Sequence, residues 1–262
     1  MEVIVVPTNV EVGRLGAAEV AAVAAAKPSA VIGLATGSSP ESLYAGLRER
    51  VTAGEISFAE ARGFALDEYV GLPLEHPQSY AGVIRRTVVE PLGFHPSRMR
   101  VPDGLAPDLD AAATAYEAAI AEAGGIDIQI LGIGTNGHIG FNEPTSSFAS
   151  RTRVKTLAPR TREDNSRFFG SVEEVPIHCV TQGLGTILEA KRLLLVAQGP
   201  RKAAAIAAAV EGPLSSFVPA SALQLHEHAT VIVDEAAAAE LRLTDYYRFS
   251  QDHRLARAAA AA

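Results

Sequence analysis

A dense glycine loop lies in the middle of the chain, in the stretch Leu131-Gly132-Ile133-Gly134-Thr135-Asn136-Gly137-His138-Ile139-Gly140-Phe141-Asn142-Glu143-Pro144. It overlaps the end of residues 126–133, an apolar run typical of a buried strand. Its four glycines fall within nine residues, and they let the backbone turn sharply and approach a ligand closely. In open parallel sheets such a loop marks the edge where ligands bind.

Five other apolar runs are typical of strands, and helix-like segments lie between most of them. The runs cover residues 2–6, 30–34, 63–66, 192–197 and 230–233. Helix starts are indicated by the capping-box spacing of Thr8 and Glu11, by Pro40, by Asp108, and by Pro200 ahead of an Ala-rich stretch. Strands that alternate with helices predict an α/β fold, with a mostly parallel central sheet and helices on both faces.

Length and composition predict a single domain. The chain has 262 residues and is 48% hydrophobic, enough to bury a core without a disulfide or a structural metal. No strong linker divides it, so we expect one α/β catalytic domain over residues 1–250. Residues 251–262 are expected to form a low-complexity tail, for which a frayed end, a short helical end and an artificial extension all remain open.

Charge, cysteine content and hydropathy exclude several classes of protein. The net charge of −7 argues against general nucleic-acid binding, although an anionic small molecule responds to local charge instead. Cys179 is the only cysteine, which rules out an intramolecular disulfide and a zinc site of several thiolates. No apolar run is long enough to span a membrane, and the N-terminus resembles a first strand rather than a secretion signal. We therefore expect a cytoplasmic protein that binds neither nucleic acid nor a membrane.

Two strand–helix junctions are candidates for phosphate binding. At the first, backbone N–H groups of a small-residue turn and the following helix suit a phosphate, although an ordinary capped turn fits equally well. At the second, Arg201 and Lys202 lie in the first turn of a predicted helix, where a positive charge is unfavourable by ~0.3–1 kcal/mol. An anion bound between them would remove this cost, and side chains that point into solvent would reduce it. Six cations between residues 151 and 167 fit a solvated face, a phosphate site or a subunit contact. The first turn consists of Thr36, Gly37, Ser38 and Ser39.

Carboxylates and a histidine at two other strand ends suggest acid–base chemistry. Asp67 and Glu68 follow residues 63–66, and neighbours in an extended segment point to opposite sides, so one of the two is expected to face a ligand. An ionised Asp67 over a C–H bond would act as a general base, whereas a solvated acid pair is the plainer alternative. His138 lies in the glycine loop, where histidine suits proton transfer near neutral pH and Glu143 could hold its ring. Without an HExxH helix or a cysteine cluster, no metal is expected.

Taken together, these segments resemble the glucosamine-6-phosphate deaminase (glucosamine-6-phosphate isomerase) family, from about the first strand to about Tyr247. The resemblance implies a Rossmann-like α/β fold. It also implies hydrolysis of glucosamine 6-phosphate to fructose 6-phosphate and ammonia, without a metal or an organic cofactor. The motifs that carry it are Asp67-Glu68-Tyr69-Val70-Gly71-Leu72, Gly132-Ile133-Gly134, Gly137-His138-Ile139-Gly140-Phe141-Asn142-Glu143-Pro144, Ser150-Arg151-Thr152-Arg153-Val154-Lys155-Thr156-Leu157, Asn165-Ser166-Arg167-Phe168-Phe169 and Ser221-Ala222-Leu223-Gln224-Leu225-His226.

The resemblance assigns roles to residues at two ends of a substrate. Asp67 would move a proton between C2 and C1 through an enol(amine), and His138 would serve ring opening. A closed pyranose has no carbonyl, so its C2 proton becomes acidic only after the ring opens. The implied catalytic residues are Asp67, Asn136, His138 and Glu143, and the implied phosphate ligands are Arg167, Lys202 and residues 36–39.

Asn136 departs from the family, because some members carry aspartate at this position. An amide neither accepts a proton nor carries charge, so we expect Asn136 only to orient its neighbours. Some members are hexamers that an acetylated amino-sugar phosphate activates between subunits, and Ser146, Arg153 and Lys155 fit the positions used there. A homo-oligomer and such regulation both stay open.

Two rival functions fit part of the pattern. A 6-phosphogluconolactonase has a similar Gly-His loop but needs no enolisation base, so Asp67 discriminates against it. A non-catalytic sugar-phosphate sensor ranks below both enzymes, because the sequence contains no helix-turn-helix or basic DNA-reading helix. Release of ammonia and fructose 6-phosphate would separate all three.

Overall fold

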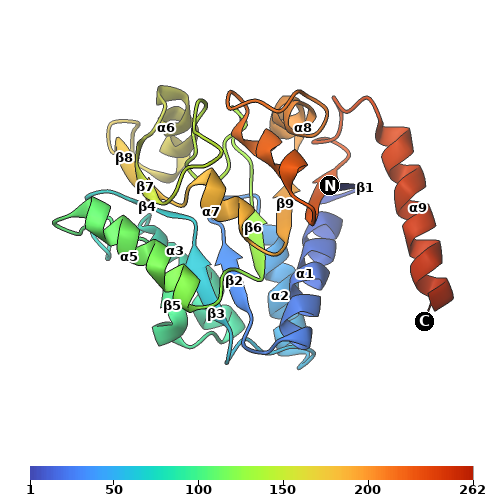
Figure 1. Cartoon of the computed structure of the whole chain (residues 1–262), viewed down its shortest axis with the longest axis horizontal. Coiled ribbons are helices and arrows are strands. Elements are labelled where there is room, and N and C mark those ends of the chain that lie inside the picture. Colours follow the sequence, from blue (N-terminus) through green and yellow to red (C-terminus); the bar gives the residue numbers. More distant parts are fainter. Residues whose placement is uncertain (262) are drawn as a thin grey trace.

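Seven parallel strands form the central sheet of the computed structural model, which describes the backbone of residues 1–261 and the side-chain burial of residues 1–253 (Figure 1). Their order is β1-β10-β9-β6-β2-β3-β5. All six predicted runs lie in this sheet, so the predicted α/β class is confirmed, and only the two-residue β5 was not predicted. The strands are β1 (Glu2–Val6), β2 (Val31–Leu34), β3 (Arg62–Ala65), β5 (Met99–Arg100), β6 (Ile128–Leu131), β9 (Leu193–Ala197) and β10 (Ala229–Asp234).

The helices around this sheet begin close to where the sequence predicts. Thr8 caps α1 by accepting a hydrogen bond from the Glu11 N–H, and Asp108 caps α5. Pro40 is the residue before α2 rather than its first residue. The predicted helix at Pro200 starts with a 3₁₀ turn, so α8 begins three residues later. These helices are α1 (Asn9–Ala26), α2 (Glu41–Thr52), α5 (Leu109–Glu122) and α8 (Ala203–Val210), and a short helix that was not predicted is α7 (Leu184–Leu188).

A second, antiparallel sheet was not predicted from the sequence. It consists of β4 (Asp67–Tyr69), β8 (His178–Thr181) and β7 (Arg153–Thr156), in the order β4-β8-β7. Figure 1 shows it beside α6, at one end of the molecule. Residues 67–69 therefore form a strand of this second sheet, which agrees with the extended conformation expected for the Asp-Glu segment. Strands of three or four residues with several polar side chains are too short to produce a recognisable alternation.

Short helical segments complete the part of the structure around the site. Residues 80–92 form a continuous helical stretch, in which a π-helical turn separates two α-helical pieces. Its pieces are α3 (Tyr80–Ile84), η1 (Arg85–Val89) and α4 (Glu90–Leu92), and the other segments are η2 (Pro96–Arg98), α6 (Pro159–Asn165), η3 (Ser166–Phe168), η4 (Pro200–Lys202) and η5 (Pro219–Leu225).

The last helix, α9 (Thr244–Ala261), lies along one side of the molecule (Figure 1). Its first turns are held by a hydrogen bond from the Tyr247 hydroxyl to Glu211 and by an ion pair between Arg248 and Glu235 at 2.6 Å. The predicted boundary at residue 250 falls inside α9, so the division into a domain and a tail stays a prediction, and residue 262 lies outside the described residues. None of the helices within residues 1–261 has the length and apolar character needed to cross a bilayer.

Candidate active site

A cavity of about 790 Å³ is lined by the segments that follow β2, β3, β6 and β9. Parallel strands end at the same edge of a sheet, so these four segments meet although they are far apart in the sequence. Most of the predicted site residues face the same space. Those that line the cavity are Thr36, Gly37, Ser38, Ser39, Asp67, His138, Arg167 and Lys202, and those that do not are Asn136, Glu143, Ser146, Arg153 and Lys155.

Asp67 presents a buried carboxyl group to the cavity from the first residue of β4. Its exposed fraction is only 5%. Burial raises the pKa of Asp67 to about 8, the nearby charge of Glu68 adds to the rise, and the backbone N–H of Phe141 opposes it. A carboxylate with so high a pKa is a much stronger base than one in water, once it has lost its proton.

Glu68 points away from the cavity, as the alternation along an extended segment predicts. Its carboxylate accepts hydrogen bonds from the backbone N–H groups of Tyr69, Tyr80 and Ala81, at 2.8, 2.9 and 2.8 Å. Burial raises the pKa of Glu68, and these N–H groups counteract part of that rise. Both acids are buried, so the alternative of a solvated pair is wrong. Through its bonds to Tyr80 and Ala81, Glu68 connects β4 with the start of α3.

His138 faces the cavity from the glycine loop. A Cβ atom at Gly134 would lie 2.3 Å from Cε1 of His138, so the ring packs against the loop only because residue 134 has no side chain. Nδ1 of His138 lies 3.7 Å from Oε2 of Glu143, which is longer than a hydrogen bond. Nδ1 is buried and has no hydrogen-bond partner among the described residues.

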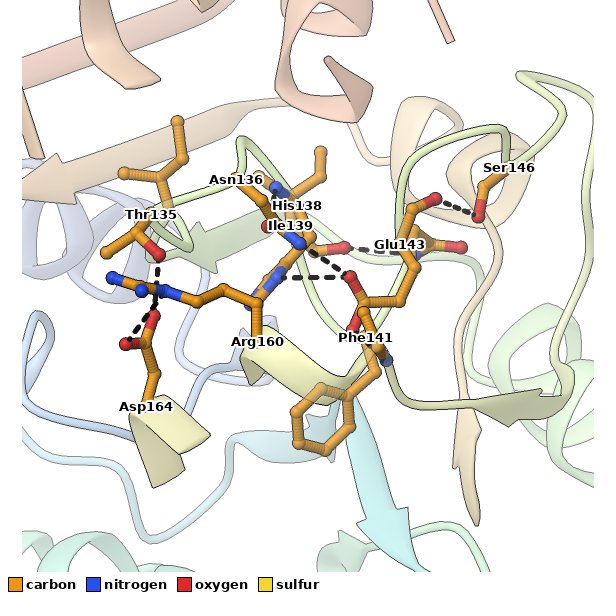
Figure 2. A network of polar contacts seen from close by, with 12 residues as sticks. Thr135, Asn136, His138, Ile139, Phe141, Glu143, Ser146, Arg160 and Asp164 are labelled. Atoms are coloured by element: carbon orange, nitrogen blue, oxygen red, sulfur yellow. Dashed lines mark hydrogen bonds and ion pairs between the residues drawn. The ribbon is translucent and has the colours of Figure 1, made fainter. Parts of the chain in front are cut away.

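Two hydrogen bonds hold the Glu143 carboxylate behind His138. Figure 2 shows Asn136 beside the same carboxylate, and its Nδ2 donates to Oε2 at 2.7 Å, while the N–H of Ala158 donates to Oε1 at 2.9 Å. Burial disfavours the ionised form, but the histidine, Thr161 and the Ala158 N–H outweigh it and lower the pKa of Glu143 to about 2. Glu143 is therefore ionised, and Asn136 occupies the oxygen that faces the imidazole.

Positive side chains line the cavity as well, among them Arg167 and Lys202. Gly37 has φ +91°, a left-handed conformation that favours glycine in the turn after β2. Arg167 donates to the hydroxyl of Ser38 at 3.4 Å, and Lys202 donates to a backbone carbonyl of the glycine loop. Burial lowers the pKa of Lys202, and the positive charge of Arg167 lowers it further. Two cations that destabilise each other in this way are suited to an anion between them.

The turn at the start of α8 offers fewer free backbone donors than the sequence suggested. The N–H of Gly199 already donates to the carboxylate of Asp234, at 3.0 and 3.1 Å to its two oxygens. Gln198 lines the cavity and connects this turn to the turn after β2, because its Nε2 donates to the carbonyl of Ser39 at 2.9 Å. The side chains of residues 201 and 202, rather than the N–H of Gly199, are available to an anion here.

Ser146 and Arg153 lie behind the glycine loop. The hydroxyl of Ser146 donates to the carbonyl of Glu143 at 2.7 Å, and Arg153 donates to Oδ1 of Asn142 at 3.0 Å and to the Ser146 hydroxyl at 3.2 Å. Lys155 follows on the same strand, β7. These contacts brace the segment that carries Glu143, and a regulatory role for the three residues stays a prediction.

Several cavity residues are not among the site residues predicted from the sequence. Tyr80 and Asn165 line the cavity, and Asn165 donates to the hydroxyl of Tyr69 at 2.9 Å. Arg48 and Arg86 also line it, from helices whose exposed arginines look alike in the sequence. Within the part of the chain that the structure describes, no group of three or more His, Cys, Asp or Glu side chains could hold a metal ion.

The matching family model is described as glucosamine-6-phosphate isomerases/6-phosphogluconolactonase, and it covers residues 10–232. The chain belongs to this family. Among the family's glucosamine-6-phosphate deaminases, that of Mycolicibacterium smegmatis is 56% identical over 249 residues, 95% of each chain. That of Streptomyces coelicolor is 55% identical over 255 residues, 97% of this chain and 98% of the other.

Solved structures of the family agree with this assignment. A monomeric glucosamine-6-phosphate deaminase superposes with a TM-score of 0.90 at 42% identity, and the match covers 92% of this chain and 100% of that one. A 6-phosphogluconolactonase from Trypanosoma cruzi superposes with a TM-score of 0.74 at 21% identity, over 92% of this chain and 97% of the other. The second likeness reflects the shared fold alone.

Proposed function

We propose that the protein converts glucosamine 6-phosphate and water to fructose 6-phosphate and ammonia. The observation that carries the proposal is that Asp67 and His138 line one cavity together with Arg167 and Lys202. An enolisation base, a ring-opening group and an anion site are the three parts that this reaction needs. The 53–56% identity to deaminases over nearly the whole chain supports the same reaction.

The reaction begins with ring opening at His138. The imidazole moves the proton of the C1 hydroxyl to the ring oxygen, so that the C1 aldehyde forms next to the amino-bearing C2. The ionised Glu143 stabilises the imidazolium that appears during this transfer, and Asn136 fixes the orientation of that carboxylate. The phosphate is untouched, and its binding energy at Arg167 and Lys202 is available for orientation.

Asp67 then carries out the isomerisation. Its carboxylate removes the C2 proton while the C1 oxygen takes up a proton from solvent, which leaves a C1–C2 double bond in an enol(amine). The resulting carboxyl group returns its proton to C1, and the nitrogen on C2 releases a proton to solvent. The product is an imine at C2. Water adds to that carbon and ammonia leaves, which gives the ketone of fructose 6-phosphate. These steps balance with proton transfers and one water molecule.

A coupled assay tests this function. Purified protein with glucosamine 6-phosphate is expected to release ammonia and fructose 6-phosphate in equal amounts. A 6-phosphogluconolactone substrate in a parallel assay tests the rival lactonase activity. If saturating glucosamine 6-phosphate yields no ammonia while the lactone is hydrolysed, the lactonase is correct. If both substrates bind and neither reacts, the protein is a sugar-phosphate sensor.

The cellular setting and assembly belong to the same proposal. A single cysteine, Cys179, which is fully buried, supports a reducing, cytoplasmic location. The related solved structure is described as monomeric. A homo-oligomer of the present protein stays a prediction. Sedimentation at micromolar concentration, with and without an acetylated amino-sugar phosphate, tests both the assembly and the regulatory role of Ser146, Arg153 and Lys155.

A further inference from the structure

The cavity extends beyond the residues that the proposed reaction uses. One side of the extension is formed by Glu41, Ala45 and Arg48, which share a face of α2 at positions i, i+4 and i+7. The extension is also lined by Val83 and Arg86 of the helical stretch over residues 80–92. Both arginines are exposed, whereas Asp67 is buried, so this part of the cavity is its outer rim.

The two rim arginines differ from their nearest arginine neighbours. Arg50, two residues from Arg48, pairs with Glu55 at 2.8 Å, and Arg85, next to Arg86, pairs with a glutamate at 3.7 Å. Neither of these neighbours lines the cavity. Within the described part of the chain, Arg48 and Arg86 have no carboxylate partner; Arg86 donates only to the carbonyl of residue 77. The charges that face the cavity are thus left unneutralised, while those beside it are paired.

The cavity as a whole is positive in a chain whose net charge is negative. Glu41, Asp67 and Asp164 are its acidic side chains, against five cations, although the whole chain carries −7. A concave surface with charges of one sign and low-dielectric walls focuses the electric field and attracts the opposite charge. The cations are Arg48, Arg86, Arg167, Arg201 and Lys202.

We propose that Arg48 and Arg86 form an anion-attracting entrance, which a phosphorylated sugar passes before its phosphate reaches the inner site. Their effect is long-range attraction rather than a contact kept in the bound complex. It therefore depends on ionic strength, because exposed charges are screened beyond about 10 Å at 0.1 M salt. The identity of the sugar rests on the proposed function, but the attraction of a phosphate does not.

The test compares two double variants with equal changes of charge. Arg48→Gln/Arg86→Gln removes the entrance pair, and Arg50→Gln/Arg85→Gln removes the matched pair outside the cavity. At low ionic strength the entrance variant is expected to lower kcat/KM for glucosamine 6-phosphate by roughly 3- to 10-fold relative to the matched variant. At about 0.5 M salt the difference should shrink to less than about 2-fold. Equal thermal unfolding of the two variants confirms that both are folded.

A second readout separates this proposal from the proposed function. Calorimetric titration with inorganic phosphate, on the same proteins and at the same two ionic strengths, should show weaker binding to the entrance variant at low salt only. If the wild-type protein releases no ammonia, the proposed function fails, and the phosphate titration still decides about the entrance. Equal phosphate affinities of the two variants at low salt would overturn the proposed entrance. A loss of phosphate affinity in the entrance variant that is just as large at high salt would overturn it as well.

Discussion

Asp67 and Glu68 show how neighbouring acids acquire different tasks. Both are buried, yet the carboxylate of Glu68 accepts three backbone N–H groups, while no such set of donors surrounds Asp67. Desolvation therefore dominates at Asp67 and turns it into a strong base. The negative charge of Glu68 raises the pKa of Asp67 further, although Glu68 itself does not line the cavity.

The pH dependence of turnover tests this view of Asp67. Only the ionised carboxylate removes a proton, and its pKa is about 8 in the free protein, so kcat/KM should rise with pH and reach half its plateau near pH 8. Glu68→Gln keeps a side-chain oxygen for the N–H groups but removes the charge, so it should move this midpoint to lower pH. The ionisations of the substrate are titrated separately as a control. A profile that is flat between pH 6 and 9 would be inconsistent with Asp67 as the base.

At the scale of elements, the carboxyl ends of the strands gather the site. The loop after β6 carries His138, the turn after β2 meets Arg167, and Gln198 after β9 connects to the turn after β2. Segment 158–165 is attached to the same loop, because Thr135 donates to Asp164 at 2.5 Å (Figure 2). The anion site is thus assembled from three elements rather than from one helix N-terminus.

Removal of either inner cation should weaken substrate binding. A hydrogen bond to a charged group is worth about 1.5–3 kcal/mol, so Lys202→Ala and Arg167→Ala should each raise KM for glucosamine 6-phosphate by about 10-fold or more. Arg14→Ala, on an exposed position of α1 that does not line the cavity, is the matched control and should leave KM unchanged. Unchanged KM in both inner variants would mean that the phosphate is held elsewhere.

At the scale of the whole molecule, the buried base costs stability. The folded-state pKa of Asp67 is about 8, above the unfolded value of about 3.9, so its contribution is most favourable below about pH 4 and is lost as the pH rises through 8. Asp67→Asn imitates the protonated form. Its Tm should therefore exceed that of the wild type, by an amount that grows between pH 5 and pH 9 and corresponds to roughly 5 kcal/mol at the alkaline end. A Tm difference that does not vary with pH would contradict this burial cost.

Much of this organisation follows from local patterns in the sequence. Apolar runs predicted six strands of the central sheet, and Thr8 and Asp108 predicted two helix starts, since these signals lie within a few residues. The antiparallel sheet was not predicted because its strands are short and because the pairing of β4 with β8 joins residues more than a hundred positions apart, such as Asp67 and Thr181. The glycine loop is another local signal, and it predicted a site at the histidine that it contains.

The finer contacts of the site could not be predicted. The bond from Asn136 to Glu143 depends on the path of a whole loop, and the position of Arg48 at the cavity rim depends on how α2 packs. Neither the bond nor the position of Arg48 is marked by a residue spacing that would distinguish it from other arrangements of the same segments. The resemblance to a family supplied residue roles, but it did not supply these orientations.

The role of Asp67 as the base is decided by ammonia release from Asp67→Asn, measured together with binding of glucosamine 6-phosphate. The variant should still bind the substrate, and kcat should fall by at least about 100-fold, as expected when a general base is removed. Turnover by a correctly folded Asp67→Asn at the wild-type rate would contradict the account, because the proton between C2 and C1 would then travel without this carboxylate.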